Sequence, residues 1–334
     1  MSEAAQRDLY FSYFMFTANM QPDDPKWAKI HAERAVKLAE MGYTGCDLPI
    51  APTDIADRAR DVANYAKLKQ AFDDAGVHHL KLTTNVGATQ TYDPTSPDEV
   101  QRSAALSYLK SRVDITAVLG GGILAGPIVL PYGLFPTTNG NQPIWSDALQ
   151  EWVKRRYRNA QPILEELGHY AKDKGVKLAI EPVDHWETCS PNSVTEVLSF
   201  LQGVPCRQVG VCIDSAHVAL GSDGVSVFER EVGSDSPRIH SIHISAPDRG
   251  AVHDSWIPWK LFLKPLLKSY DGPFLIEVFN AIPLFQPLLR LTRRKFWIPG
   301  EDDPEPGLPS AFDIAHDAIK AVRHEITALC TPAT

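Results

Sequence analysis

The sequence of 334 residues lacks several features that would place it in a particular class of protein. Its five cysteines are scattered and none belongs to a CxxC pair, which argues against both a disulfide framework and a thiolate zinc site. No apolar run approaches the roughly 18 residues that are needed to span a bilayer. The N-terminus has no basic segment leading into an apolar signal core. We therefore expect a cytoplasmic protein with free thiols and no membrane partner.

An excess of basic residues is also missing. Lysine and arginine number 33 against 41 aspartates and glutamates, which leaves a net charge of −8. Such a chain repels a phosphate backbone, and the short stretch 290–295 is its one dense basic cluster. No GxGxxG or GxxxxGK[ST] motif is present. We expect no nucleic-acid partner and a small neutral molecule as the ligand.

What the sequence does contain is a regular alternation of short β-rich runs and longer amphipathic stretches. Continuous apolar strands that alternate with helices are typical of a parallel sheet covered on both faces. The stretch 27–41 fits a helix, and Gly42, Gly76 and Gly175 each follow a helical stretch where a C-terminal cap is expected. The predicted strands are 9–17, 44–50, 78–84, 121–128, 176–182, 209–215, 239–245 and 273–280.

Eight such units predict a (β/α)8 TIM barrel, because an open doubly wound sheet usually has about six strands and a glycine-rich phosphate loop after the first. We expect one domain over residues 1–334, with the barrel at about 9–330. Segments 129–146 and 281–310 are longer than a barrel needs and follow the fourth and eighth strands. They are candidate lids or contacts in a homo-oligomer, and a partner subunit could also bind there.

A residue that can bind a metal lies at or near the end of each of the last four predicted strands. These are Glu181, Asp214, His243 and Glu277, spaced by 33, 29 and 34 residues, or about one βα unit each. Residues at equivalent depths on consecutive barrel strands converge at one rim. A single buried carboxylate could belong to a structural ion pair, but four such residues with no lysine or arginine at the same strand ends favour a bound cation.

The chemistry of these four side chains narrows the choice of metal. Three carboxylates and one imidazole form a mostly hard donor set, which suits one divalent ion such as Mn²⁺, with Mg²⁺ or Co²⁺ as alternatives. The three negative charges exceed the charge of the ion by one. One carboxylate can therefore remain basic enough to move a proton.

These residues lie in segments that resemble the xylose isomerase-like TIM-barrel superfamily of sugar phosphate isomerases and epimerases, in particular ketose 3-epimerases such as D-tagatose 3-epimerase. The similarity extends over nearly the whole chain in the order and spacing of its motifs. The segments that carry it are Glu181 with Trp186 and Glu187, Asp214 to His217, His243 to Ser245, Asp248 to Gly250, Glu277 in LIEVF, and Gly126-Pro127 with Pro131 and Gly133.

The resemblance implies how the site works. Glu181 and Glu277 would bind the metal and also move a proton, one removing it next to the substrate carbonyl and the other returning it on the opposite face. Proton loss creates an enediolate that a chelated metal stabilises. His217 and Arg249 would bind substrate oxygens, with a hydrogen bond to a neighbouring group and a solvated loop position as the respective alternatives.

Several further residues are candidates for the pocket. Glu187 could accept a substrate hydroxyl or be an exposed loop acid, and His185 could be an additional acid or base near the metal or simply pack. Trp186 is the best candidate for an apolar wall. Tyr10, Phe14 and Trp145 are weaker candidates for the same wall, and Asp47 could reach the pocket or cap a helix.

Other functions stay open beside the epimerase, among them a simple isomerase or an inosose-type dehydratase. The long segments 129–146 and 281–310 could admit a larger substrate, which leads to a further alternative. A lyase resembling the barrel subunit of the C-glycoside deglycosidases would act on 3-keto glycosides by the same proton abstraction, and His185 would then gain a role. A non-catalytic sugar-binding barrel should have lost at least one ligand or proton carrier, whereas all four positions are filled here.

Overall fold

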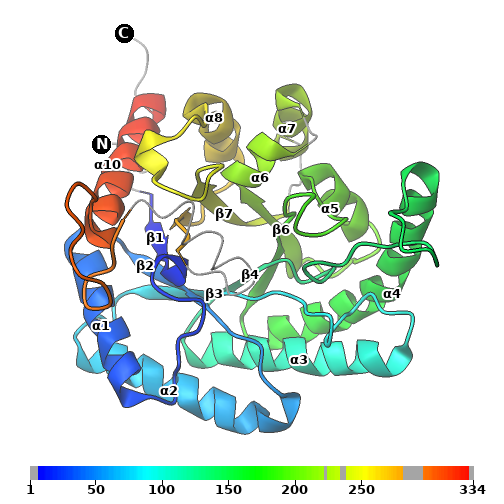
Figure 1. Cartoon of the computed structure of the whole chain (residues 1–334), viewed down its shortest axis with the longest axis horizontal. Coiled ribbons are helices and arrows are strands. Elements are labelled where there is room, and N and C mark those ends of the chain that lie inside the picture. Colours follow the sequence, from blue (N-terminus) through cyan, green and yellow to red (C-terminus); the bar gives the residue numbers. More distant parts are fainter. Residues whose placement is uncertain (1–6, 222–223, 234–237, 281–295, 331–334) are drawn as a thin grey trace.

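Eight parallel strands close into one barrel, in which each strand pairs with its neighbours in the sequence and β1 pairs with β8 (Figure 1). The computed structural model describes residues 7–221, 224–233, 238–280 and 296–330. The strands are β1 (Leu9–Ser12), β2 (Gly45–Pro49), β3 (Lys81–Asn85), β4 (Ile123–Gly126), β5 (Lys177–Ile180), β6 (Val209–Asp214), β7 (Ile239–Ser245) and β8 (Phe274–Glu277). The predicted (β/α)8 barrel is confirmed.

Helices surround the barrel and connect successive strands (Figure 1). The α-helices are α1 (Pro25–Glu40), α2 (Arg58–Asp74), α3 (Glu99–Val118), α4 (Ser146–Asp173), α5 (Val194–Leu201), α6 (Ser215–Leu220), α7 (Val225–Val232), α8 (Trp259–Ser269) and α10 (Ala311–Cys330). The 3-10 turns are η2 (Tyr13–Met15), η3 (Ile55–Asp57) and η4 (Val252–Asp254). No helix in the described part of the chain is long and apolar enough to cross a membrane.

Local sequence sets where these elements begin and end. The helix predicted at 27–41 begins two residues earlier, because the Asp24 side chain accepts a hydrogen bond from the Lys26 backbone and Pro25 occupies the first turn. Gly42, Gly76 and Gly175 have φ values of 96°, 83° and 72°. All three take the left-handed conformation that ends a helix and that other residues adopt at a cost.

The first strand is shorter than predicted. The run 9–17 is extended only as far as Ser12, whose hydroxyl accepts a hydrogen bond from the Phe14 backbone and starts the turn η2. This turn is a local side-chain to backbone interaction, which hydrophobic periodicity does not reveal.

A small apolar cluster from three barrel strands is separate from the larger hydrophobic core. Ala125, Ala179 and Cys212 form this cluster. Gly45 leaves space for the ring of Tyr10, which would lie 2.5 Å from a Cβ at that position.

The two long connections follow β4 and β8, as predicted. The connection before α4 contains an isolated bridge between Thr137 and Pro143, and the one before α10 contains a bridge between Trp297 and Ser310. Residues 281–295, which include the basic stretch 290–295, lie outside the described residues. The expected subunit contacts through these segments stay a prediction.

Candidate active site

The four predicted ligands converge at the carboxyl-end rim of the barrel. Glu181 follows β5 directly, Asp214 and Glu277 are the last residues of β6 and β8, and His243 lies within β7. One ligand atom from each lies within 4.8 Å of the others. His243 Nδ1 is 3.1 Å from Glu181 Oε1 and 3.8 Å from Glu277 Oε1. All four side chains are buried, so the structure brings together what the spacing predicted.

A glycine next to Glu181 permits this arrangement. Gly126 has φ 129°, and a Cβ there would lie 2.2 Å from the Val86 carbonyl oxygen. Its own carbonyl accepts a hydrogen bond of 3.0 Å from the Glu181 backbone. The end of β4 therefore lies so close to the end of β3 that only glycine fits at position 126. The hydrogen bond to its carbonyl oxygen holds the Glu181 backbone at the rim.

Asp214 is held on both oxygens. Its Oδ1 accepts hydrogen bonds from the Ala216 backbone (2.6 Å) and from Ser245 Oγ (2.6 Å), and it caps the N-terminus of α6. Its Oδ2 accepts a hydrogen bond of 3.1 Å from Arg249 Nη1. Burial opposes ionisation, but Arg249, His217 and His243 outweigh it and hold the pKa of Asp214 well below its usual value. Asp214 is thus an oriented carboxylate.

Arg249 brings a positive charge to the four predicted ligands, which the strand ends alone did not indicate. No arginine or lysine lies at the four strand ends, but Arg249 from the loop after β7 reaches the cluster, 3.1 Å from Asp214 and 3.5 Å from Glu277. Its backbone has φ 57°, and its guanidinium lies 4.9 Å from the centroid of the Phe279 ring. A non-glycine residue in this region costs about 1–3 kcal/mol, a strain typical of functional sites. The guanidinium of Arg249 is therefore a cationic partner of two of the carboxylates.

Arg249 does not pair with every buried oxygen of the four-residue cluster. Among the described residues, the Oε1 atom of Glu277 is buried without a hydrogen-bond partner. Burial raises the pKa of Glu277 well above its usual value; His243 opposes this rise and Glu181 reinforces it. Three buried carboxylates and His243 Nδ1 lie around one point, and this mostly hard donor set with one unpaired oxygen fits a divalent cation.

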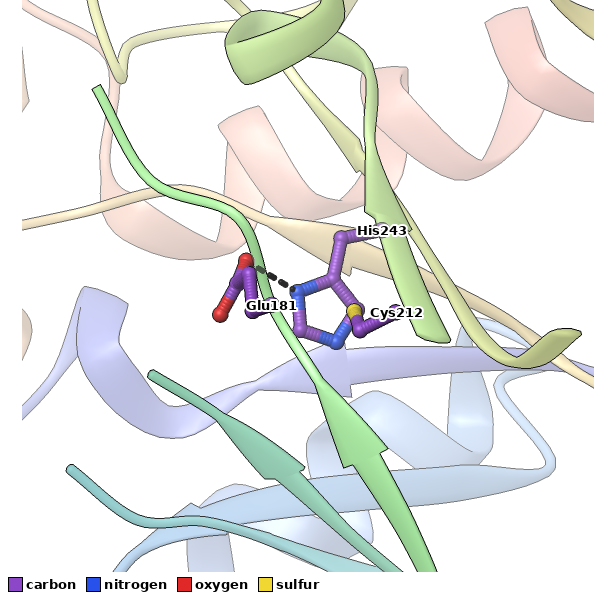
Figure 2. A group of neighbouring side chains, drawn as sticks. All are labelled: Glu181, Cys212 and His243. Atoms are coloured by element: carbon purple, nitrogen blue, oxygen red, sulfur yellow. Dashed lines mark hydrogen bonds and ion pairs between the residues drawn. The ribbon is translucent and has the colours of Figure 1, made fainter. Parts of the chain in front are cut away.

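Cys212 lies beside this cluster and forms a second group of possible metal ligands with Glu181 and His243. Figure 2 shows the Glu181 carboxylate pointing at His243 Nδ1, while the Cys212 sulfur lies beside the ring on the side away from Glu181. Burial raises the pKa of the Cys212 thiol to about 12. The Cys212 thiol is therefore neutral in the metal-free protein.

A cavity of about 300 Å³ opens next to the cluster. Its polar side includes Glu181 and Glu277 together with three predicted substrate-binding residues, Glu187, His217 and Arg249. The other side is largely apolar and is formed by Phe14, Ala18, Pro49, Ile50, Ala51, Pro52, Ala88 and Phe279. The cavity thus joins two candidate proton carriers to a surface that suits the carbon chain of a small molecule.

Two predicted site residues are not brought to the cavity. His185 and Trp186 are exposed, Trp186 to 52%, and their rings pack on each other with centroids 4.9 Å apart. Neither lines the cavity. Of the other aromatic candidates, Phe14 lines it, whereas Tyr10 is buried below and Trp145 is 72% exposed. The loop after β5 turns outward at His185 and inward again at Glu187.

His217 lies between two charged neighbours. Its Nδ1 is 3.2 Å from Asp184 Oδ1, and its Nε2 is 2.6 Å from Arg249 Nη2 and 3.8 Å from Glu181 Oε1. Burial and Arg249 lower its pKa, but Asp214, Asp184 and Glu181 raise it more, and the pKa lies above its usual value. The ring edge that carries Nε2 faces the candidate site.

Sequence reasoning missed several residues around the cavity. Tyr132 and Asn85 line it, and Asp184 lies behind His217. Asp184 could have been found from the sequence, because Asp184 and Glu187 form an acidic pair three and six residues after Glu181. Asp47 neither caps a helix nor lines the cavity: it lies in β2 and accepts a hydrogen bond of 2.6 Å from Thr83 Oγ1.

The fold and this rim define the class of protein. Residues 35–295 match the xylose isomerase-like TIM barrel family, and the chain belongs to that family. One of its relatives of known structure is a protein of Anabaena variabilis ATCC 29413, which is described provisionally as a sugar phosphate isomerase/epimerase. That solved structure is 53% identical, covers 97% of this chain and 99% of its own, and has a TM-score of 0.93.

Other relatives have named activities. An L-ribulose 3-epimerase from Methylomonas sp. (strain DH-1) is 24% identical over 258 residues, which cover 76% of this chain and 81% of the relative. The solved D-allulose 3-epimerase from Methylomonas sp. is 21% identical, covers 96% of this chain and 97% of its own, and has a TM-score of 0.73. At 21% identity, the similarity to this structure shows a shared fold alone.

Proposed function

We propose that this protein is a divalent-metal-dependent ketose 3-epimerase. The observation that carries the proposal is that Glu181 and Glu277 belong to the four-residue cluster and also line the cavity. Two carboxylates that share a metal site and a substrate cavity are suited to moving a proton on and off a carbon next to a carbonyl. Similarity to relatives named as ketose 3-epimerases supports the same reaction.

Glu181, Asp214, His243 and Glu277 would hold the cation, for which Mn²⁺ is our first choice. When bound, a divalent cation polarises the substrate carbonyl as a Lewis acid and orients the adjacent hydroxyl. Asp214 is held in place by Ser245 and Arg249, which restricts the position of its carboxylate. The protein therefore presents a largely oriented set of donors.

Proton transfer falls to the two glutamates. They come from different strands, so they can reach opposite faces of a substrate carbon held between them, one removing the proton and the other returning one. Burial of Glu277 raises its pKa and thus favours a carboxyl group that carries a proton. His185 receives no proton-transfer role in this proposal, because it is exposed and does not line the cavity.

The lining favours an uncharged sugar over a sugar phosphate. Among the described residues that line the cavity, Arg249 is the one arginine or lysine, and it already pairs with Asp214 and Glu277. A phosphate would meet buried carboxylates without a free cation to neutralise it. Glu187, His217 and Arg249 can hydrogen-bond hydroxyl groups instead.

The test is incubation of the Mn²⁺-loaded protein in D2O with a panel of free ketoses and 3-keto glycosides, followed by NMR. We expect deuterium at the carbon next to the carbonyl and the appearance of the C3 epimer of one or more ketoses. Release of an aglycone from a 3-keto glycoside would instead indicate a lyase. Absence of exchange with every compound, in protein shown to contain metal, would refute the proposal and favour a binding protein.

A further inference from the structure

The two ring nitrogens of His217 have different nearest partners, and these contacts indicate where the proton of the neutral ring lies. Arg249 Nη2 is 2.6 Å from Nε2 and 3.4 Å from Nδ1, whereas Asp184 Oδ1 is 3.2 Å from Nδ1. A guanidinium group can only donate hydrogen bonds, so the shorter of its two contacts favours Nε2 as the acceptor. In the neutral form of His217 the single ring proton then lies on Nδ1, where the Asp184 carboxylate can accept it.

Asp184 is positioned to accept that proton. Its Oδ1 is 3.2 Å from His217 Nδ1 and receives no hydrogen bond of standard geometry from any described residue. The Asp184 side chain is 3% exposed. The alternative acceptor, Glu187 Oε2, is 3.9 Å from Nδ1 and already accepts a hydrogen bond of 2.9 Å from the Asp184 backbone. A buried acceptor without a donor thus faces a buried donor.

Asp184, Glu187 and His217 could also suggest a second cation site, since their ligand atoms lie within 4.8 Å of one another. Arg249 already brings a positive charge to this group through its contact with His217. A second cation there would repel the guanidinium at close range. The geometry therefore favours a hydrogen-bonded pair over a metal site.

We propose that Asp184 is a positioning residue that accepts the Nδ1 proton of His217 and so keeps Nε2 turned toward the cavity. Asp184 does not line the cavity, whereas His217 does. Its effect on a substrate must therefore pass through His217, whose Nε2 would accept a substrate hydroxyl together with Arg249. This last step rests on the proposed ketose 3-epimerase function, but the Asp184–His217 hydrogen bond does not.

The experiment measures the tautomer of His217 and the kinetics separately. Metal-free protein labelled with ¹⁵N-histidine is studied by long-range ¹H–¹⁵N NMR, and the His217 signals are assigned from their loss in His217→Gln. Asp184→Asn keeps an oxygen acceptor, whereas Asp184→Leu removes it at similar size. Asp114→Asn, which removes a mostly buried carboxylate paired with Arg58 between helices, is the control for general effects.

We expect the Nδ1–H tautomer in the wild type, in Asp184→Asn and in Asp114→Asn, and a mixture of tautomers in Asp184→Leu. With Mn²⁺ and a ketose, kcat/KM should fall about 10–100-fold in Asp184→Leu, chiefly through KM, and recover largely in Asp184→Asn.

Two results would overturn the inference. A wild-type spectrum with the His217 proton on Nε2 would do so without any variant, and so would an Asp184→Leu protein with an unchanged tautomer and unchanged KM. Wild-type protein that epimerises no ketose would refute the proposed function instead, and the NMR result would still decide whether Asp184 holds His217.

Discussion

Replacing Arg249 by methionine should destabilise the metal-free protein and increase the stabilisation that Mn²⁺ provides. The Arg249 side chain is 12% exposed and pairs with Asp214 at 3.1 Å and with Glu277 at 3.5 Å. Methionine keeps an apolar stem that can pack on Phe279 but removes the charge. Two buried carboxylates then lose the cationic partner that the structure shows.

The size of the effect follows from burial and chain length. Removing one partner of a buried ion pair costs about 3–5 kcal/mol. At about 2.1 cal/mol/K per residue, a chain of this length unfolds with an entropy of about 0.7 kcal/mol/K, so the midpoint should fall by about 4–7 °C. A cation at 100 times its Kd adds about 2.7 kcal/mol, or about 4 °C, in the wild type. In the variant it also replaces the missing charge, so the Mn²⁺ shift should be larger by a few degrees.

Thermal unfolding of both proteins, with EDTA and with Mn²⁺, measures these shifts. Arg156→Met is a matched control, because Arg156 is 15% exposed, pairs with Asp93 at 3.2 Å and lies over the Trp152 ring. That control should lose stability without any change in its Mn²⁺ shift. A Mn²⁺ shift in Arg249→Met that equals or falls below the wild-type shift would refute the idea that Arg249 and the cation neutralise the same carboxylates.

Three further predictions concern the barrel rim and interior. Glu181→Gln and Glu277→Gln should each fold yet lose at least about 100-fold in kcat, since each loses a proton carrier; near-normal turnover in either would contradict their roles. His243→Ala should contain less metal by elemental analysis after loading with Mn²⁺, and full occupancy would argue against His243 as a ligand. Burial raises the pKa of Asp47 from 3.8 to about 6, so the folded protein binds this proton more tightly than the unfolded chain, and stability should fall as pH rises from about 4 through 6. Metal-free Asp47→Asn should therefore be more stable than the wild type at pH 7, by about 3 kcal/mol in denaturant unfolding. The two proteins should be similar below pH 4, and an equal difference at both pH values would contradict the assignment.

Much of the site could be predicted because a barrel converts sequence order into spatial order. Glu181, Asp214, His243 and Glu277 are each about one βα unit apart, and parallel strands bring such residues to one rim whatever the loops between them do. The helix-ending glycines behave similarly, because a left-handed residue is a local requirement. Local and periodic signals of this kind can be read from the sequence without the tertiary structure.

The direction of individual loop side chains was not predictable in the same way. His185 and Glu187 are separated by one residue, yet the first is exposed and the second lines the cavity. Loop backbones have no fixed period, so spacing cannot state which side chain turns inward. Phe14 reaches the cavity for a comparable reason, because the turn after β1 redirects a residue that the sequence pattern assigned to a strand.

The sequence by itself therefore determined the barrel, the order of its strands and the four residues at its rim, because each depends on periodicity or on equivalent strand positions. Only the tertiary structure decided that Arg249 pairs with Asp214 and that Asp184 faces His217. These contacts join separate loops and helices across the rim, and their partners depend on where several irregular backbones meet. Long-range charge pairing of this kind leaves no spacing in the sequence from which it could be derived.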